Sequence, residues 1–391
     1  MRILQIIPVF SALFGGPVRV VRFISKELAK RHEVTVYTTS ALDHRRDFKH
    51  STFEDKLDGY RVVYFPRAFR FTGFNVSPSM ARALKDTIVE YDVVHLHSWR
   101  HFQDVITHHY AKKYNVPYVL QVHGSLPWIS AKQKLKLIYD VSFGYRLLRD
   151  ASKVIALSRV EAEQYRSRGV PEEKIAIIPN GIDLSEYANL PPRGAFKKKF
   201  GIPEDKKVIL YLGRIHRTKG IDLLVEAYAY LRKEMSYKDA VLVIAGPDDG
   251  YLSKIKSLAQ SLGVSISILF TGLLSEKDKI RAYVDSSLVV NVEPLNVYGL
   301  VPLEAAACST PVIVSKTNAI SEVVLNGKFG FSVEYGDVTT FASMLYRVLT
   351  DEKLAENLGK NGREYVLNNL GWNKIVEKYE QVYIDVIKNN H

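Results

Sequence analysis

The chain has 391 residues, of which 47% are hydrophobic and 25% charged, a balance typical of a folded globular protein. This composition excludes a disordered, collagen-like or coiled-coil protein, and the length predicts two domains of about 150–200 residues each. No apolar run reaches the roughly 18 residues of a membrane-spanning helix. The single cysteine, Cys308, fits a reducing compartment, so we expect a cytoplasmic protein.

The positive charge is concentrated in the first half of the chain. The formal net charge is +12; residues 1–200 hold 32 Lys and Arg against 19 Asp and Glu, and residues 201–391 hold 22 against 23. A basic half favours an anionic partner such as nucleic acid, a phospholipid surface or a phosphorylated substrate.

Short apolar runs alternate with segments of helical periodicity along residues 1–180. Continuous apolar strands are typical of a parallel sheet that is covered on both faces, and the alternation indicates a doubly wound α/β domain. The predicted strands are residues 3–7, 34–37, 62–65, 93–96, 118–122, 154–157 and 175–178.

The alternation stops at residues 189–199 (NLPPRGAFKKK), which we interpret as a linker because of its prolines and glycine. It then restarts, which predicts an α/β protein of two facing Rossmann-like domains, residues 1–190 and 200–371. The predicted strands of the second domain are residues 208–212, 241–245, 267–270, 288–291, 311–314 and 330–333.

Ligands of such sheets bind beyond the carboxyl ends of the strands, so the residues that follow each strand are candidates. In the first half, Gly15 and Gly16 precede a helix and offer backbone amides to an anion, although a tight turn explains them equally well. His123, followed by a glycine, is placed to touch a ligand or to be a rim histidine. His95 and His97 share a strand face, which suits a metal, but no carboxylate or cysteine cluster lies nearby, so we expect none.

In the second half, Gly213 and Arg214 follow a strand and Lys219 precedes a helix. Two cations at a strand–helix junction suit a pyrophosphate, the alternative being solvated charges. Gly299, Leu300 and Val301 would open a buried helix that carries Glu304, a carboxylate for which ribose hydroxyls would be hydrogen-bond partners.

The order and spacing of these landmarks resemble the retaining glycosyltransferases of family four, which have the GT-B fold. The resemblance covers nearly the whole chain. It rests on the glycines, His123 and the Arg214/Lys219 pair named above, together with residues 178–183 (IPNGID), 245–246 (AG) and 299–311.

The resemblance implies a nucleotide-sugar donor held mainly by the second domain. Arg214 and Lys219 would bind the pyrophosphate, the amides of Leu300 and Val301 would complete the cradle, and Glu304 would hold the ribose. His123 would contact the donor sugar, and Gly15 and Gly16 would lie beneath the diphosphate. The family needs no metal or other cofactor at this site, because these cations and amides balance the charge of the leaving diphosphate. The C-terminal segment, residues 372–391, would return to the N-terminal domain.

One departure concerns Asn296, which stands eight residues before Glu304 where the family has a glutamate that reads the donor sugar. An amide still forms hydrogen bonds but carries no charge. Glu293 is nearby but out of register.

The leading hypothesis is therefore a hexosyltransferase that acts with retention on a glycan or lipid-linked acceptor. The alternatives are a sugar-nucleotide epimerase of the same fold, an inactive nucleotide-sugar-binding protein, and a nucleic-acid-binding protein, for which we find no reading module. We expect no nucleic-acid partner.

An anionic acceptor predicts contact between the basic half and the cytoplasmic face of a membrane. The candidate patch combines residues 67–71 and Phe74 with residues 128–148, where lysines and arginines accompany exposed or core-facing apolar residues. The alternative is a solvated face over a core helix.

Overall fold

The computed structural model describes residues 1–11, 16–42, 46–48, 51–71, 74–127, 133–293 and 298–390. The chain divides into two compact units, and each is described by itself. The N-terminal unit comprises Met1–Gly181 and Trp372–His391, and the C-terminal unit comprises Ile182–Gly371.

A largely parallel sheet forms the centre of the N-terminal unit, with strand order β10-β9-β8-β7-β1-β2-β4-β3. Only the β3–β4 pair of this sheet is antiparallel, and β5 (Phe69–Phe71) and β6 (Phe74–Val76) form a separate hairpin. The strands are β1 (Arg2–Val9), β2 (Glu33–Thr39), β3 (Phe53–Leu57), β4 (Tyr60–Phe65), β7 (Val93–Leu96), β8 (Tyr118–Gln121), β9 (Lys153–Ala156) and β10 (Ile175–Ile177).

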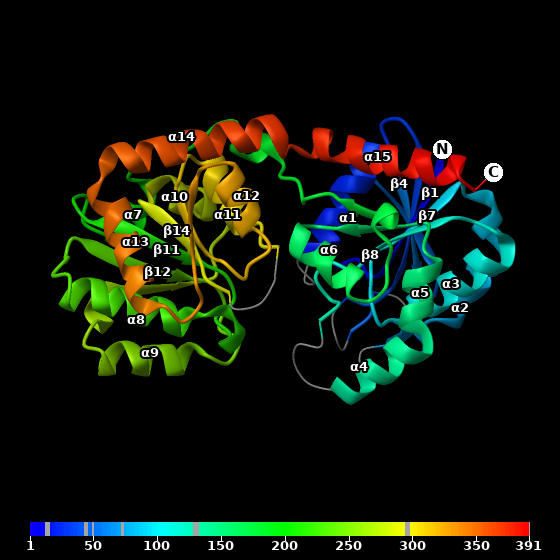
Figure 1. Cartoon of the computed structure of the whole chain (residues 1–391), viewed down its shortest axis with the longest axis horizontal. Helices are drawn as coiled ribbons and strands as arrows, with labels where there is room; N and C mark the ends of the chain where they lie inside the picture. Colours follow the sequence, from blue (N-terminus) through cyan, green and yellow to red (C-terminus); the bar gives the residue numbers. More distant parts are fainter. Residues whose placement is uncertain are drawn as a thin grey trace. The chain divides into compact units, whose positions relative to one another are not determined.

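Helices cover both faces of this sheet (Figure 1). Helix α1 packs against α15, which also contacts β7 and β8, while α2 packs against α3. The helices are α1 (Gly16–Leu28), α2 (Pro78–Thr87), α3 (Phe102–Tyr114), α4 (Gln133–Tyr139), α5 (Tyr145–Asp150), α6 (Arg159–Arg166) and α15 (Trp372–Lys388). The C-terminal helix α15 thus belongs to the N-terminal unit, as the resemblance implied.

The C-terminal unit contains a fully parallel sheet in the order β13-β12-β11-β14-β15-β16. Its strands are β11 (Lys207–Leu212), β12 (Ala240–Ala245), β13 (Ile268–Gly272), β14 (Leu288–Asn291), β15 (Val312–Ser315) and β16 (Gly330–Val333). Its helices are α7 (Ala195–Phe200), α8 (Ile221–Lys233), α9 (Leu252–Ser261), α10 (Glu276–Asp285), α11 (Val301–Ala307), α12 (Ser321–Asn326), α13 (Val338–Thr350) and α14 (Glu352–Asn369).

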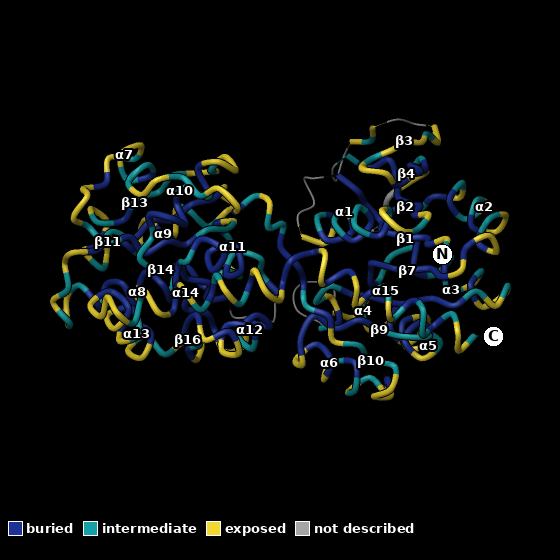
Figure 2. The backbone as a smooth tube through the Cα atoms, turned by 90° about the horizontal axis from the view of Figure 1, so that it is seen from above, coloured by how far each residue is buried: buried dark blue, intermediate teal, exposed yellow. Residues whose placement is uncertain are grey.

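The central strands are buried along almost their whole length, and exposed residues gather in the connections and on the outer sides of helices (Figure 2). The predicted α/β class and the two parallel-sheet domains are therefore confirmed. In the described part of the chain, no helix is both long and apolar enough to cross a membrane.

The predicted linker is wrong, because residues 189–199 belong to the C-terminal unit. The carboxylate of Asp285 accepts hydrogen bonds from the amides of Gly194 (2.6 Å), Phe196 (2.7 Å) and Lys197 (3.1 Å), and the Phe196 side chain is fully buried. The prolines and glycine lead into helix α7 instead of joining domains, and the division falls between Gly181 and Ile182, not near residue 190.

Candidate active site

The strand order reverses between β11 and β14, because β12 and β13 lie on one side of β11 and β14 to β16 on the other. Beyond the carboxyl ends of two such strands, the connections diverge and leave room for a ligand. Arg214 and Lys219 follow β11, and Glu293, Gly299 and Glu304 follow β14. The structure therefore gathers the described members of the predicted set in the second half around one switch point.

Glycines let the connections at this edge approach one another closely. A Cβ atom on Gly246, whose φ is +145°, would lie 1.9 Å from the carbonyl oxygen of Gly213. A Cβ on Gly220 (φ +65°), at the start of α8, would lie 2.2 Å from the carbonyl oxygen of Val292. Larger residues would push these connections apart, so the glycines fix the positions of Arg214 and Lys219.

Arg214 is an exposed cation with a replaceable partner. Its guanidinium forms an ion pair with Asp249, and the two side chains are 61% and 43% exposed. Exposed ion pairs contribute about 0–1 kcal/mol. Arg214 can therefore exchange Asp249 for an anionic ligand at little cost.

Lys219 is more buried and is paired with Glu293. Its Nζ lies 2.8 Å from Oε1 of Glu293, and both side chains are largely shielded from solvent. Glu293 is out of register with the family's glutamate and was not among the predicted site residues. The structure makes it the counter-ion of the predicted pyrophosphate-binding lysine.

Glu304 lies on α11 and is 3% exposed. Its Oε2 accepts a hydrogen bond of 2.6 Å from the hydroxyl of Tyr283 and lies 3.5 Å from Nζ of Lys279, both on α10. Burial alone therefore does not require a ribose as partner, which corrects that part of the sequence argument. A carboxylate has two oxygens that each accept more than one hydrogen bond, so a ligand hydroxyl can donate to Glu304 in addition to Tyr283.

The start of α11 brings the other predicted residues to the same edge. Leu300 is the N-cap residue and Val301 the first helical residue. A Cβ on Gly299 would lie 3.1 Å from Nδ2 of Asn291, the last residue of β14. Asn296 lies outside the described residues.

In the N-terminal unit, the strand order reverses between β1 and β7; Gly16 follows β1, and His123 follows β8, the neighbour of β7. Gly16 begins helix α1, and a Cβ added there would meet no atom of the described chain within 4 Å. Gly15 lies outside the described residues.

His123 follows β8 in a left-handed backbone conformation, with φ +50°. The next residue, Gly124, has φ +77° and donates its amide to Oε1 of Glu161 (2.6 Å), while Oε2 of Glu161 accepts the amide of Leu157 (2.6 Å). The buried Glu161 carboxylate on α6 thus ties the connection after β8 to the connection after β9. Burial raises the pKa of Glu161, and the two amides oppose that rise.

Burial also lowers the pKa of His123 to about 3, and it lowers the pKa values of His95 and His97 well below 6.5. All three imidazoles are therefore neutral at physiological pH. They contact one another and neighbouring side chains: Nδ1 of His97 lies 3.1 Å from Nε2 of His123. Among the described residues, no group of three or more His, Cys, Asp or Glu is placed to hold a metal ion.

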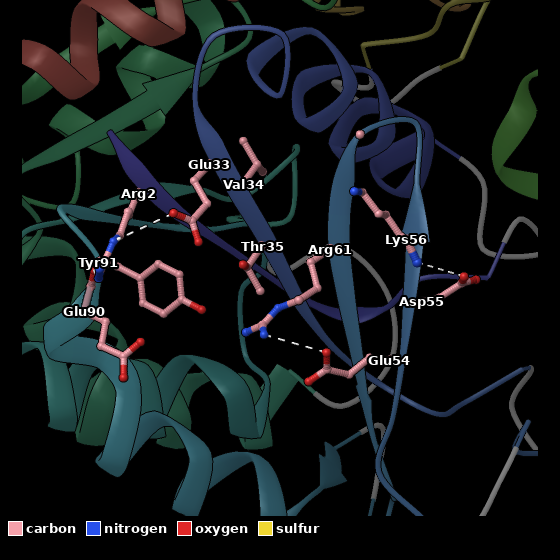
Figure 3. A pocket seen from close by; sticks show the side chains of 11 residues that line it. Arg2, Glu33, Val34, Thr35, Glu54, Asp55, Lys56, Arg61, Glu90 and Tyr91 are labelled. Atoms are coloured by element: carbon pink, nitrogen blue, oxygen red, sulfur yellow. Dashed lines mark hydrogen bonds and ion pairs between the residues drawn. The ribbon is translucent and has the colours of Figure 1, made fainter.

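A pocket of about 650 Å³ lies at the opposite edge of the N-terminal sheet, where β1, β2 and β4 begin (Figure 3). Its charges are partly paired within the protein, Arg2 with Glu33 (3.8 Å) and Arg61 with Glu54 (3.7 Å). Ligands of parallel α/β sheets bind at the carboxyl ends of the strands, so we do not include this pocket in the candidate active site.

Some residues of the predicted basic and apolar patch are exposed, and others are buried in the core. Residues 133–150 form α4, a π-helical turn (Asp140–Gly144) and α5. Leu135 (49%), Ile138 (61%) and Val141 (61%) are exposed, whereas Leu148 is buried. Trp128, Ile129 and Lys132 lie outside the described residues.

The hairpin part of the patch is partly wrong. Arg67 does not face outward, because its side chain is 8% exposed and pairs with Asp47 at 3.0 Å. Phe69 is 58% exposed, and Phe74 packs edge-on against Tyr139 at the end of α4.

Comparison with known proteins identifies the class. The chain is 29% identical over 303 residues to an uncharacterized glycosyltransferase of Methanocaldococcus jannaschii, covering 75% of each chain. It is 27% identical over 364 residues to a GDP-mannose-dependent phosphatidylinositol monomannoside mannosyltransferase of Mycolicibacterium smegmatis, covering 88% of each. The structure of HepE from Anabaena with UDP and glucose matches with a TM-score of 0.77 and 18% identity, over 98% of this chain and all of that one. The protein is a glycosyltransferase with the GT-B fold.

Two family models place it more narrowly. Residues 192–365 match the model of the glycosyl transferases group 1, and residues 14–186 match that of glycosyltransferase family 4. The chain belongs to the group 1 glycosyltransferases of the GT-B type.

Proposed function

We propose that this glycosyltransferase moves a hexosyl group from a nucleoside-diphosphate sugar to a glycan or lipid-linked acceptor, with retention of the anomeric configuration. The observation that carries the proposal is the gathering of Arg214, Lys219 and the start of α11 at the β11/β14 switch point. HepE binds UDP and the mycobacterial relative uses GDP-mannose, so a nucleoside diphosphate is the shared chemistry.

The diphosphate is the leaving group, and negative charge develops on it as the glycosidic bond breaks. Arg214 and Lys219 stabilise that charge, and the backbone amides of Leu300 and Val301 complete the cradle. These groups serve in place of a metal, so we expect no cofactor. Glu304 accepts hydrogen bonds from ribose hydroxyls.

His123 acts on the donor sugar as a neutral hydrogen-bonding group, because its pKa lies far below physiological pH. It neither carries a charge to the diphosphate nor serves as a cationic acid. Its contribution is to orient the sugar while the diphosphate leaves.

The acceptor side of the proposal places the N-terminal unit at the cytoplasmic face of an anionic membrane. Support comes from the exposed apolar side chains of Leu135, Ile138 and Val141 beside Lys134 and Arg146. Such a combination binds anionic lipid through burial of apolar surface and through about 1 kcal/mol per basic residue.

The test is incubation with a panel of UDP- and GDP-sugars and lipid or glycan acceptors, followed by measurement of nucleoside diphosphate release. The wild-type protein should release diphosphate with one donor class and form a product of unchanged anomeric configuration by NMR, and Lys219→Ala should not. Epimerised sugar nucleotide without diphosphate release would indicate the epimerase, and binding without turnover would indicate an inactive binding protein.

A further inference from the structure

Five buried or half-buried polar side chains form a continuous chain beneath helix α15. They come from separate elements: Gln5 from β1, His95 from β7, His97 and His123 from the connections that follow β7 and β8, and Tyr383 from α15. Gln5, His95 and Tyr383 are fully buried, and His97 is 2% exposed.

The distances link these side chains one after another. Nε2 of His123 lies 3.1 Å from Nδ1 of His97, and Nε2 of His97 lies 2.5 Å from Oε1 of Gln5. Nε2 of Gln5 donates to the hydroxyl of Tyr383 at 3.3 Å, and that hydroxyl lies 2.6 Å from Nδ1 of His95.

Each link fixes the proton position in the next because a neutral imidazole has one donor and one acceptor nitrogen. The carbonyl oxygen of Gln5 can only accept, so His97 carries its proton on Nε2. Nδ1 of His97 is then an acceptor, and Nε2 of His123 must be the donor. At the other end, the Tyr383 hydroxyl accepts from Gln5 and donates to Nδ1 of His95.

The reverse direction would require the Gln5 amide to turn over. Its nitrogen would then lie 2.5 Å from the His97 ring nitrogen, shorter than hydrogen bonds between nitrogen and its partners. The direction deduced above leaves the Nε2 proton of His95 without an acceptor in the described part of the chain, an energetic cost that the four links of the chain offset.

We infer that this chain holds His123 as the tautomer protonated on Nε2, and that Tyr383 of the C-terminal helix is a positioning residue for it. The low pKa values of the three histidines support the inference, because a protonated imidazole in the chain would have no acceptor nitrogen.

The consequence concerns which donors the enzyme accepts, and it rests on the proposed function. With Nε2 donating inward, Nδ1 is the acceptor that His123 offers to a ligand. It can accept from a sugar hydroxyl, but it repels a carboxylate at the same position, so the structure favours neutral hexosyl donors over uronic acid donors.

Nitrogen NMR of the histidine-labelled protein tests the tautomer without any substrate. The chain has 11 histidines, and the His123→Ala spectrum identifies the missing resonances. In the wild type, His123 should carry its proton on Nε2 alone. In Tyr383→Phe the Gln5 amide loses its fixed partner, and His123 should become a mixture of both tautomers.

Tyr379→Phe is the matched control, because Tyr379 lies one turn earlier on α15 and is equally buried. Its hydroxyl lies 3.1 and 3.2 Å from the side-chain nitrogen and oxygen of Gln121, which is not one of the five side chains. Tyr379→Phe should leave the His123 tautomer unchanged. Tyr383→Phe should lower the transfer rate several-fold with unchanged nucleoside diphosphate affinity, and Tyr379→Phe should not.

A proton on Nδ1 of wild-type His123 would overturn the inference, as would identical His123 spectra for Tyr383→Phe and wild type. If Tyr383→Phe does not fold, the wild-type spectrum alone decides. A correct tautomer in a protein that releases no nucleoside diphosphate would refute the proposed function and leave this inference standing.

Discussion

Two carboxylates of the C-terminal unit, Glu293 and Glu304, are buried beside lysines. They differ in whether a bound ligand would compete for their partners. Glu304 is held by Tyr283 and Lys279 on the helix behind it, so it keeps its place when a ligand arrives. Glu293 balances Lys219, the cation proposed to meet the diphosphate, so it competes with the ligand for that charge.

Replacing Glu293 by Gln should therefore strengthen binding of nucleoside diphosphate. Removing one negative charge close to the diphosphate contributes on the order of 1 kcal/mol, about a five- to tenfold tighter dissociation constant by calorimetry. Glu352→Gln is the control, because Glu352 pairs with Lys207 at the opposite end of β11. Weaker binding in Glu293→Gln than in Glu352→Gln would mean that Glu293 serves to position Lys219.

His123→Ala should slow transfer and leave nucleotide affinity unchanged. Loss of one positioned hydrogen-bonding group costs roughly 100-fold in turnover. Steady-state rates and calorimetry on the same preparation separate the two effects. A variant that transfers normally but binds nucleoside diphosphate poorly contradicts the proposed role.

The residue types at the site could be predicted from sequence, but their partners could not. Arg214, Lys219 and Glu304 stand out because they follow apolar strands. Their partners Asp249, Glu293 and Tyr283 lie 35, 74 and 21 residues away, and only the parallel sheet brings them together. The chain from His123 to Tyr383 spans an even longer sequence separation and gave no local signal.

At the scale of elements, the segment α4 to α5 carries exposed apolar side chains, among them Leu135, Ile138 and Val141, together with basic residues. The carboxylate of Asp140 in this segment accepts two hydrogen bonds from Arg100, at 2.9 and 2.7 Å. Arg100 also donates to the carbonyl oxygens of Ser125 and Leu126, just after His123. Arg100 thus links the π-helical turn between α4 and α5 to the connection that follows β8.

This surface should bind anionic vesicles and not neutral ones. Flotation with phosphatidylglycerol vesicles should show binding that weakens as salt rises, because surface charges are screened within about 10 Å at 0.1 M salt. Reversal of Lys134 and Lys136 to Glu should abolish it at low salt. Equal reversal of the exposed Lys353 and Lys360 in α14 is the control, and equal loss in both variants would disprove a dedicated surface.

Sequence periodicity predicts the strands well, but it does not predict where one domain ends and the next begins. Buried parallel strands read as apolar runs, so β11, β12 and β14 were placed within two residues. The prediction of a linker before α7 is wrong because prolines and glycines occur at the starts of helices as well as between domains. The hydrogen bond from the amide of Gly194 to the distant Asp285 shows that this segment starts a helix of the C-terminal unit.

At the scale of the whole molecule, α15 joins the end of the chain to its beginning. The hydroxyl of Tyr383 hydrogen-bonds to the buried side chain of Gln5. Glu380 pairs with His32 at 2.6 Å and also with Arg31, and Trp372 stacks on Phe23 with ring centres 5.5 Å apart. The N-terminal unit therefore requires the last residues of the chain to complete its core.

The buried histidines make this unit sensitive to acid. Their pKa values are lower in the folded protein than the 6.5 of the unfolded chain, so unfolding takes up protons below pH 6.5 and stability falls as the pH drops. Each contributes up to about 1.4 kcal/mol per pH unit below 6.5. Urea unfolding at pH 7.5, 6.5 and 5.5 should show the decline, and His97→Gln should make it shallower. If the free energy of unfolding falls equally steeply with pH in wild type and in His97→Gln, buried neutral histidines do not cause the acid sensitivity.

Calorimetric titration of nucleoside diphosphate into the double variant Arg214→Ala/Glu304→Gln tests the central claim most directly. Each charge-assisted hydrogen bond lost should cost about 1.5–3 kcal/mol, so the affinity should fall at least tenfold. Arg166→Ala, which removes another arginine that is paired with a carboxylate, should bind as the wild type does. Unchanged affinity in the double variant would show that the β11/β14 edge is not the donor site.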